Sequence, residues 1–324
     1  MPRLPAILLL TALAAAAVLL SLAIGSSGAG PAEFWGALVG GDDPVARSIL
    51  LDLRLPRTIA AFTTGAVLAL AGVLMQVLLR NPLADPYVLG VSGGAAVAAL
   101  GAMLAGLSGL WVDLGAAGGA LAAMWVVFAL AHGRGGWTPA RLLLTGIVVA
   151  AGCASAVSVL LALADEAPVR SMLFWLMGDF SYAGMPWLGI AVLAIALPLC
   201  IGLARPLDVL ARGDLQASIV GLPVRPVRIG LYVGASLLTA AAVTTAGSIG
   251  FVGLVTPHLV RLALGASHRV VVPAAVLLGG ILVTLADLAA RTVVAPRQLP
   301  VGALTALVGV PLFLALMRRQ RSIA

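Results

Sequence analysis

The sequence has 324 residues, of which 62% are apolar and only 10% are charged, and its formal net charge is +7. A soluble domain usually carries about a quarter charged residues, so this chain has too few of them to cover a surface that faces water. We therefore predict a helical protein embedded in a bilayer and surrounded by membrane lipids. The arginines are spread between apolar runs and form no basic face, which argues against nucleic acid as a partner.

Ten apolar segments approach the length of about 20 residues that a membrane span needs. They predict an all-α, polytopic fold with about ten transmembrane helices in a single domain, residues 1–324. The first segment resembles a signal peptide, but it is long enough to span and no soluble domain follows it, so we interpret it as the first span. In chain order the segments are 6–24, 58–79, 92–108, 115–132, 142–163, 187–204, 229–247, 250–266, 273–291 and 302–317.

The arginines also predict the orientation of the chain. If the N-terminus is cytoplasmic and the sides alternate, 13 arginines fall inside and 6 fall outside, as the positive-inside rule requires. Arg3 and the cluster Arg318–Arg321 both favour the cytoplasm, which requires an even number of spans. Both termini are therefore predicted to be cytoplasmic, with long outer segments at 25–57 and 165–186 and the largest inner segment at 205–228.

A weak internal repeat relates the two halves of the chain. Gly65–Leu68 lies early in the second span, and Gly234–Leu237 lies early in the seventh. Five spans separate the two runs, so the copies would have opposite orientations, as in the inverted repeats of transporters. A coincidence between two helices rich in Ala and Leu is the open alternative.

Charged residues within the spans are rare. Asp287 and Arg291 lie four residues apart near the outer end of the ninth segment, where they can pair with each other. A proton- or sodium-coupled carrier normally needs an ionisable residue near the midplane, and the spans contain no carboxylate there. This favours transport driven by a partner ATPase, and an ion-coupled secondary transporter of a small solute stays open as the alternative.

Other functional classes fit the sequence less well. It contains no filter-like motif or ring-forming pattern of charges typical of a channel, and no GxSxG or HExxH motif typical of an enzyme. Cys153 and Cys200 are isolated within apolar segments, so we expect neither a disulfide framework nor a metal site. A membrane scaffold or receptor without transport activity is a further alternative.

Several longer motifs are more specific than composition. LRLPR at 53–57 precedes the second span, and RNPLADPYVLGVSGG at 80–94 follows it. GSIGFVGLVTPH occupies 247–258, FWLMG lies at 174–178 in the second outer segment, and LPVG with GVPLF follows within 299–313. In this order the motifs resemble those of the FecCD-type permeases of bacterial ATP-driven importers, which carry ferric siderophores, haem or cobalamin. The resemblance covers nearly all of the chain from about residue 47 onward.

The resemblance implies the permease fold of type II ABC importers, built as a homodimer of ten-span subunits around a central pathway. Two cytoplasmic ATPase subunits would bind below it, and a periplasmic or lipid-anchored binding protein would dock above it. The chain lacks a GxxxxGK[ST] loop, so ATP and Mg²⁺ are expected on the partner subunits, and no cofactor is expected on this chain. The expected location is the inner, cytoplasmic membrane of a bacterium.

The inner segment resembles the coupling region of the family, two short helices that seat in a cleft of the ATPase. An ordinary charged turn is the alternative on the bare sequence. Pro223 and Pro226 are expected to end the second short helix early. The positions that match the coupling region are Leu207, Asp208, Leu210, Gly213, Ala217, Gly221 and Arg228.

Three outer arginines, Arg54, Arg57 and Arg291, match family positions that receive acidic side chains of the binding protein, and Arg297 is a weaker candidate. A guanidinium group suits this role because it binds carboxylates in a bidentate manner. Alternatively, Arg54 and Arg57 only anchor the second span at the lipid headgroups, and Arg291 is used by Asp287.

The fifth span and the loop before it line and gate the exit in the family, which corresponds to residues 138–158 here. Small and weakly polar side chains in such a wall would avoid holding the cargo tightly, as release requires. The candidate pathway and gate residues are Leu142, Leu143, Thr145, Ser155 and Ser158.

Overall fold

The computed structural model describes residues 3–25, 44–132, 138–181 and 183–321. Most of the first predicted outer segment, residues 26–43, therefore lies outside the described residues. So do Arg134 and the side chains of the terminal arginines on which the predicted orientation partly depends.

Each of the ten predicted segments corresponds to one helix, and the described residues contain no strand. Within the described parts of the chain, six helices are long and apolar enough to cross a membrane on their own, counting the continuous stretch Pro44–Leu78 as one. A seventh does so if Trp187–Gly202 and Ala204–Ala211, which meet at a bend of 66°, are counted together, and three further apolar helices are shorter. The ten helices are α1 (Arg3–Ala23), α4 (Leu55–Leu78), α5 (Val91–Leu104), α6 (Leu110–Ala131), α7 (Pro139–Leu163), α9 (Trp187–Gly202), α12 (Val224–Ala246), α13 (Val252–Leu264), α14 (His268–Thr292) and α15 (Val301–Arg321).

Short helices fill the predicted connections. In the second part of the first outer segment, where we expected a connection as far as residue 57, the chain is helical: α3 (Pro44–Ser48) and the π-helix η1 (Ile49–Arg54) run directly into α4. Pro56 in the first turn of α4 lacks the N–H that would bond back along the helix, which explains the change of hydrogen-bond spacing here. The others are η2 (Pro86–Leu89), α8 (Glu166–Met177), α10 (Ala204–Ala211) and α11 (Asp214–Ile219).

Helix α4 forms the centre of the protein. It packs against α12, α13 and α14, and 89% of its most apolar window is buried, compared with 6% for α7. Glycines allow the close approach, because a Cβ atom added at Gly65 would collide with the backbone of Gly279, and one at Gly72 would collide with that of Gly253. Small residues at helix contacts are the usual means of packing helices within a membrane.

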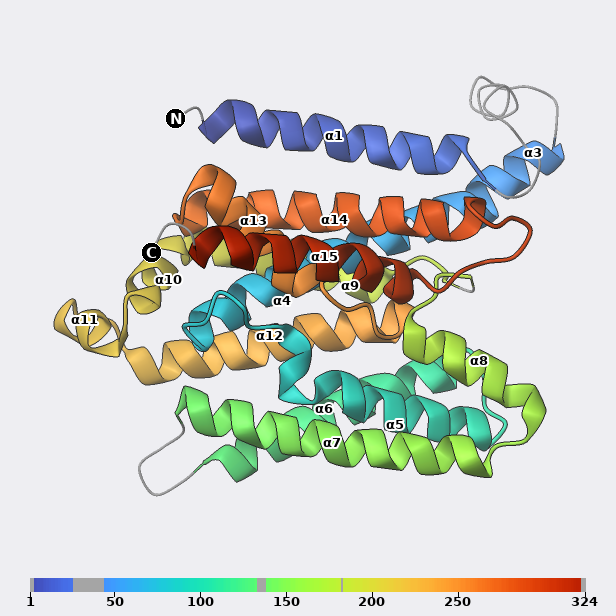
Figure 1. Ribbon diagram of the computed structural model, residues 1–324, viewed down its shortest axis with the longest axis horizontal. Helices are drawn as coiled ribbons and strands as arrows, with labels where there is room; N and C mark the ends of the chain where they lie inside the picture. The colour runs from blue at the N-terminus through green and yellow to red at the C-terminus, as the bar shows by residue number, and fades with distance from the viewer. Residues whose placement is uncertain (1–2, 26–43, 133–137, 182, 322–324) are drawn as a thin grey trace.

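The two halves repeat the same order of elements around a break. After α4 the chain turns through η2 and enters the short helix α5 from Gly90, whose φ is +74°. After α12 it passes residues 247–251 and enters the short helix α13 from Phe251, whose φ is +68°. Figure 1 shows α4 and α12 running in opposite directions, as the predicted inverted repeat requires.

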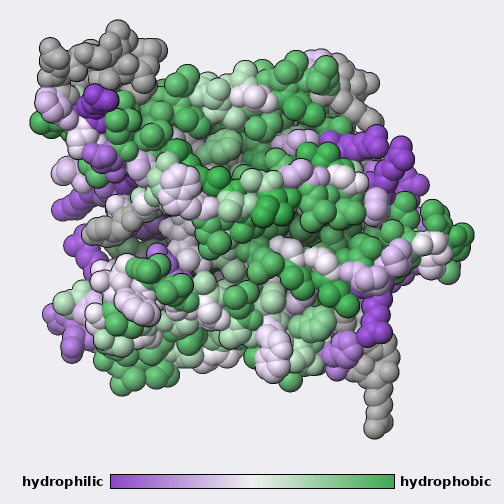
Figure 2. Space-filling model, turned by 180° about the vertical axis from the view of Figure 1, so that it is seen from behind, coloured by the Kyte–Doolittle hydropathy of each residue, from purple (hydrophilic) through white to green (hydrophobic). Residues whose placement is uncertain are grey.

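The surface divides into an apolar band and two polar ends. Figure 2 shows hydrophobic residues over the middle of one face and hydrophilic residues gathered toward the two sides. Large apolar side chains are strongly exposed, among them Trp125, Ile195 and Leu307 at 68%, 70% and 70%. A surface of this kind needs lipid or another apolar partner to cover it.

The two ends of the bundle carry different elements. Figure 1 shows α10, α11 and both ends of the chain at one end, which we call the inner end, and α3 and α8 at the opposite end, which we call the outer end. Helix α1 is an integral part of the bundle, because it packs against α14 and its Ser21 is fully buried.

Candidate functional site

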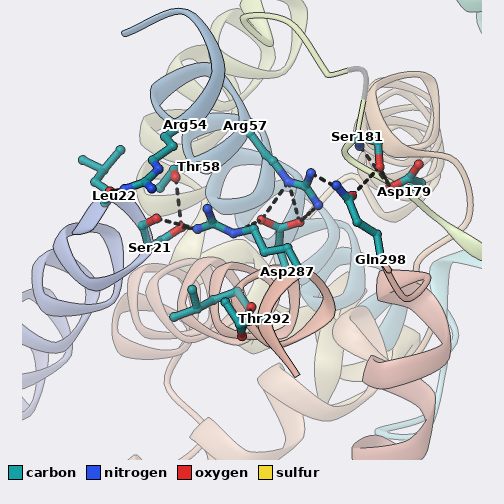
Figure 3. A network of polar contacts seen from close by, with 12 residues as sticks. Ser21, Leu22, Arg54, Arg57, Thr58, Asp179, Ser181, Asp287, Thr292 and Gln298 are labelled. Carbon is teal, nitrogen blue, oxygen red and sulfur yellow. Dashed lines mark hydrogen bonds and ion pairs between the residues drawn. The ribbon is translucent and has the colours of Figure 1, made fainter. Parts of the chain in front are cut away.

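At the outer end a buried carboxylate holds two arginines. Asp287 of α14 is fully buried, and Arg57 of α4 donates to it from Nε and Nη2 at 2.9 and 2.8 Å (Figure 3). The predicted pair with Arg291 also forms, but at a longer Nε–Oδ2 distance of 3.5 Å. The bidentate contact with Arg57 is the stronger geometry, so the partner of Asp287 that the sequence predicted is the weaker of the two.

Arg291, together with Arg54, also binds the end of α1. Arg291 donates from Nη2 to the backbone oxygen and the hydroxyl of Ser21, and that hydroxyl lies 2.9 Å from the hydroxyl of Thr58. Arg54 donates from Nη1 to the carbonyl oxygens of Leu22 at 2.9 Å and of Ala23 at 3.3 Å. The last carbonyls of a helix have no partner within the helix and carry partial negative charge, so guanidinium groups stabilise this end of α1.

A polar chain extends the network toward the other helices. Arg57 donates from Nη1 to Gln298 Oε1 at 3.0 Å. The hydroxyl of Ser181 lies 2.7 Å from the same oxygen and 2.6 Å from Asp179 Oδ1 (Figure 3). Neither Gln298 nor Ser181 was predicted from the sequence, because a single polar residue in a loop gives no signal of a partner that is distant in the chain.

The four predicted docking arginines differ in exposure. Arg54 and Arg291 are 6% and 4% exposed, and the side chain of Arg57 is 12% exposed, so all three groups point into the network described above. Arg297, in the turn between α14 and α15, is exposed. The sequence motifs made Arg297 the weaker candidate, whereas its guanidinium is the most accessible of the four.

At the inner end the two predicted short helices are present as α10 and α11. Of the predicted coupling residues, Leu207 and Leu210 of α10 and Ala217 of α11 are buried against the chain's own core. The large apolar side chains that α11 exposes are instead Leu215 and Ile219, at 75% and 76%. Their spacing of four residues places them on one helical face, a signal that the sequence already contained but that was not among the predicted coupling positions.

Glycine, not proline, ends α11. Gly221 has a φ of +81°, its N–H bonds to Ser218 O, and the N–H of Leu222 bonds to Ala217 O. This pair of bonds is the Schellman arrangement that closes a helix at a left-handed glycine. The expectation that Pro223 and Pro226 end the helix is therefore wrong: Pro226 lies in the first turn of α12, where no N–H is needed.

A hydrogen-bonded contact and an ion pair attach the inner helices to the core. Asp208 of α10 lies 2.6 Å from Nδ1 of His268 at the start of α14. Asp214 at the start of α11 lies 2.8 Å from Nη2 of Arg228 in α12. A longer contact of 3.9 Å joins Asp214 to Arg80, two residues after the end of α4. Two predicted coupling residues, Asp208 and Arg228, therefore contact the chain's own residues.

The predicted pathway residues lie on two sides of α7. Ser155 and Ser158 are exposed, and each hydroxyl bonds to the carbonyl four residues earlier in the helix. Leu143 and Thr145 are partly buried. Leu142 is fully buried and therefore faces the core, not the surface that carries the serines.

The turn before α5 contains a partly buried acidic residue with a raised pKa. Asp85 accepts a hydrogen bond from the N–H of Tyr87 at 2.8 Å and caps η2. Burial raises the pKa of Asp85 from its ordinary value to about 6, although the hydrogen bond from Tyr87 acts in the opposite direction. The hydroxyl of Tyr87 accepts the N–H of Ile249 at 3.0 Å, which joins the break before α5 to the break before α13.

No group of three or more His, Cys, Asp or Glu side chains in the described part of the chain is placed to hold a metal ion. Cys153 and Cys200 are both free thiols.

Comparisons with known proteins give one consistent family. Residues 12–319 match the FecCD transport family. The hemin transport system permease protein HmuU of Yersinia pestis is 44% identical over 283 residues, which cover 84% of this chain and 84% of that protein. The vitamin B12 import system permease protein BtuC of Citrobacter koseri is 36% identical, covering 94% and 91% of the two chains.

A further relative and two solved structures agree. The iron(3+)-hydroxamate import system permease protein FhuB of Bacillus subtilis is 40% identical, over 84% of this chain and 72% of that protein. A metal-chelate type ABC transporter in an inward-facing conformation has a TM-score of 0.85 at 30% identity, covering 97% and 98% of the chains. The PsaBC structure from Streptococcus pneumoniae, at 18% identity and a TM-score of 0.59 over 83% and 92%, supports the fold alone.

Proposed function

The chain belongs to the FecCD transport family, and on that basis we propose that it is the transmembrane permease subunit of an ATP-binding cassette importer that moves a metal chelate into the cell. The observation that carries this proposal is a family match over nearly the whole chain, together with relatives that are themselves named as permease proteins. The chain would not be an enzyme, and ATP with Mg²⁺ would be bound and hydrolysed on partner subunits.

The inner end suits a cytoplasmic ATPase. The two short helices α10 and α11 lie outside the apolar band, and α11 exposes Leu215 and Ile219 although burial would stabilise both side chains. We call the two exposed side chains of Leu215 and Ile219 the apolar ridge of α11. A partner with a cleft that covers this ridge would bury both side chains. We infer that this end is cytoplasmic, with both termini on the same side, and that one ATPase subunit binds here on each copy of the chain.

The outer end would then face the periplasm and receive the periplasmic or lipid-anchored binding protein. Arg297 supports this because it is exposed there, and its fork can bind an acidic side chain in a bidentate manner. Arg54, Arg57 and Arg291 lie close behind the surface, and they would take part once docking opens the network around Asp287.

A second copy of the chain would complete the pathway. Helix α7 is the least buried of the long helices, with 6% of its apolar window covered. Its exposed surface combines apolar side chains with the small hydroxyls of Ser155 and Ser158. Such a surface suits the wall of a cavity between two copies, where weakly polar groups let the cargo leave. Membrane lipids would cover the remaining apolar band.

The cargo class follows from the relatives. Their names give hemin, an iron(3+)-hydroxamate and vitamin B12, which are all metal ions enclosed by an organic chelator. We propose the same chemical class here, namely haem, a ferric siderophore or cobalamin. This metal is cargo, and no cofactor is expected to reside on the chain.

The test is reconstitution of the chain with its ATPase and its binding protein in proteoliposomes. We expect uptake of haem, of a ferric hydroxamate or of cobalamin only when ATP is supplied on the side of α10 and α11. Replacement of ATP by a non-hydrolysable analogue should abolish uptake. Uptake that persists without ATP and collapses with the proton gradient would show an ion-coupled secondary transporter instead.

The structure offers little support for that alternative. Asp287 is a fully buried carboxylate in a span, but it lies at the outer end and its oxygens are held by Arg57 and Arg291. A carboxylate that carries protons through a transporter must exchange partners during the cycle. The contacts of Asp287 are those of a structural ion pair.

A further inference from the structure

One acidic residue on each short inner helix joins that helix to the core. Asp208 connects α10 to α14, and Asp214 connects α11 to α12 and to the end of α4. The helices that these contacts reach are the ones that pack together at the centre of the protein, with α12 and α14 both lying against α4. The inner helices are therefore joined through these two carboxylates directly to the buried core.

The joint at α10 combines two bonds on one oxygen. Asp208 Oδ1 accepts the backbone N–H of His268 at 2.8 Å and lies 2.6 Å from the His268 ring at Nδ1. The first N–H groups of a helix have no partner within it, and a negative charge is favourable at that end. Asp208 thus caps α14 from a different helix, and α10 cannot move away from α14 without leaving this end uncapped.

The joint at α11 has few other contacts to support it. This helix has six residues, of which only Ala217 is buried. Asp214 lies 2.8 Å from Arg228 Nη2, whose side chain is 11% exposed. Because the apolar contact of α11 with the core is so small, the ion pair of Asp214 is a main attachment of this helix to α12.

Arg80 makes a second contact with Asp214, and its own backbone adopts a strained left-handed conformation. Its φ is +49°, and the bonds from Arg80 N–H to Val77 O and from Asn81 N–H to Gln76 O close α4 in the arrangement that normally uses glycine. A non-glycine residue is strained in this conformation. The side chain of Arg80, which a glycine at this position would lack, reaches Asp214, with Nη2 3.9 Å from Oδ2.

We propose that Asp208 and Asp214 are positioning residues that transmit movement of the partner ATPase from α10 and α11 to α14, and to α12 and α4. This inference rests on the proposed function. The ATPase itself would contact the exposed ridge of Leu215 and Ile219, whereas the two acidic side chains contact the chain's own His268 and Arg228. They would act through these groups and would not touch cargo or ATP.

The test measures movement at the opposite end of the protein, independently of cargo. Val293, which directly follows α14 at the outer end, is 71% exposed and can carry a spin label as cysteine. Cys153 and Cys200 are first replaced by serine and alanine. In the complete importer in nanodiscs the two copies provide one label each, and the label-to-label distance is measured before and after trapping with ATP and vanadate.

We expect a shift of this distance in the cysteine-replaced parent protein. In Asp208→Ala and Asp214→Ala the shift should fall by more than half while ATP hydrolysis stays within about twofold of the parent. Asp214→Glu should retain the shift, and Asp165→Ala, an exposed acidic residue at the outer end, is the matched control. An unchanged shift in both alanine variants would overturn the inference.

Arg80→Gly separates positioning from folding. Glycine relieves the left-handed strain, so the thermal midpoint should stay equal or rise, yet the shift should fall because the contact with Asp214 is lost. A full shift in Arg80→Gly would contradict a transmitting role for this contact, and this variant decides the matter if the alanine variants do not fold. Absence of any shift in the parent would instead overturn the proposed function, and with it this inference.

Discussion

The two ends of the protein use similar ion pairs in different surroundings. At the outer end Asp287 is fully buried between Arg57 and Arg291. At the inner end the carboxylates themselves are partly exposed: the side chains of Asp214 and Asp208 are 38% and 29% exposed, while those of their partners Arg228 and His268 are 11% and 3% exposed. A fully buried carboxylate that is lost leaves uncompensated charge in an apolar medium, whereas a partly exposed carboxylate can exchange its contacts with water.

This difference suits the two ends to different tasks. The outer network connects α1, α4 and α14 and reaches the turn before α15 through Gln298. Opening it requires that several charged groups find new partners together, as an arriving acidic protein could provide. The inner attachments each involve one partly exposed carboxylate with its own partner, so each can shift with a moving partner independently of the other.

The largest effect is expected from Asp287→Ala. It leaves Arg57 and Arg291 buried without a counter-charge, which should lower the stability by about 3–5 kcal/mol. The apparent thermal midpoint of the protein in detergent measures this. Replacing Asp214 by alanine is the matched change at the inner end and should cost less, about 1–2 kcal/mol, because the Asp214 side chain is 38% exposed and its ion pairs are partly solvated, although that of Arg228 is only 11% exposed. Equal losses for both variants would contradict the comparison of the two ends.

The next effect concerns the apolar ridge of α11. Leu215→Asp combined with Ile219→Asp should weaken binding of the ATPase by about 10–100-fold, because two buried apolar anchors are lost. Co-purification and titration of the ATPase measure the affinity. Since both side chains are exposed in this structure, the thermal midpoint of the permease alone should not change, and a fall would show that the ridge supports the fold.

A smaller effect is expected from Arg297→Glu at the outer end. The side chain is exposed, so reversal of its charge should weaken docking of the binding protein by about tenfold with little change in stability or in basal ATP hydrolysis. Arg57→Glu is a useful contrast, because it would place a second acid against Asp287 and should destabilise the protein. Docking that is unaffected by Arg297→Glu, and unaffected by raised salt, would refute a role for this arginine.

The smallest effect should be a pH dependence from Asp85. Its pKa is about 6 in the folded protein, above the value of about 3.9 in an unfolded chain. The folded state therefore binds more protons between these values, so stability should fall as the pH rises through this range, by about 1–2 kcal/mol between pH 5 and 7.5, and then level off. Thermal midpoints at pH 5 and 7.5 measure this, and Asp85→Asn, which keeps an acceptor for Tyr87, should remove the difference.

Much of the fold could be predicted because it depends on local properties. The length and hydropathy of each segment are enough to predict a helix, and all ten segments contain one. The two breaks, at η2 with Gly90 and at residues 247–251, lie within the motifs at 80–94 and 247–258, but Pro257 of the second motif lies inside α13 and does not break it. The prediction failed at Pro223 and Pro226 because Gly221 had already ended α11.

The site could be predicted only in part. The sequence indicated which arginines matter at the outer end, but the bidentate partner of Asp287 is Arg57, 230 residues away, and no local pattern reports such a contact. The same holds for α7, where Leu142 and Ser155 were both candidates for the pathway but differ in burial, because only packing against other helices decides which side of α7 is covered.

The sequence by itself determined that this chain spans a membrane, where its helices lie, and to which transport family it belongs, because hydropathy, length and motif are properties of neighbouring residues. The tertiary structure decided which charges are enclosed and which are accessible. Burial and pairing depend on which helices meet, so the enclosed Arg57 and Arg291, the exposed Arg297, and the outward-facing Leu215 and Ile219 could be distinguished only once the bundle was assembled.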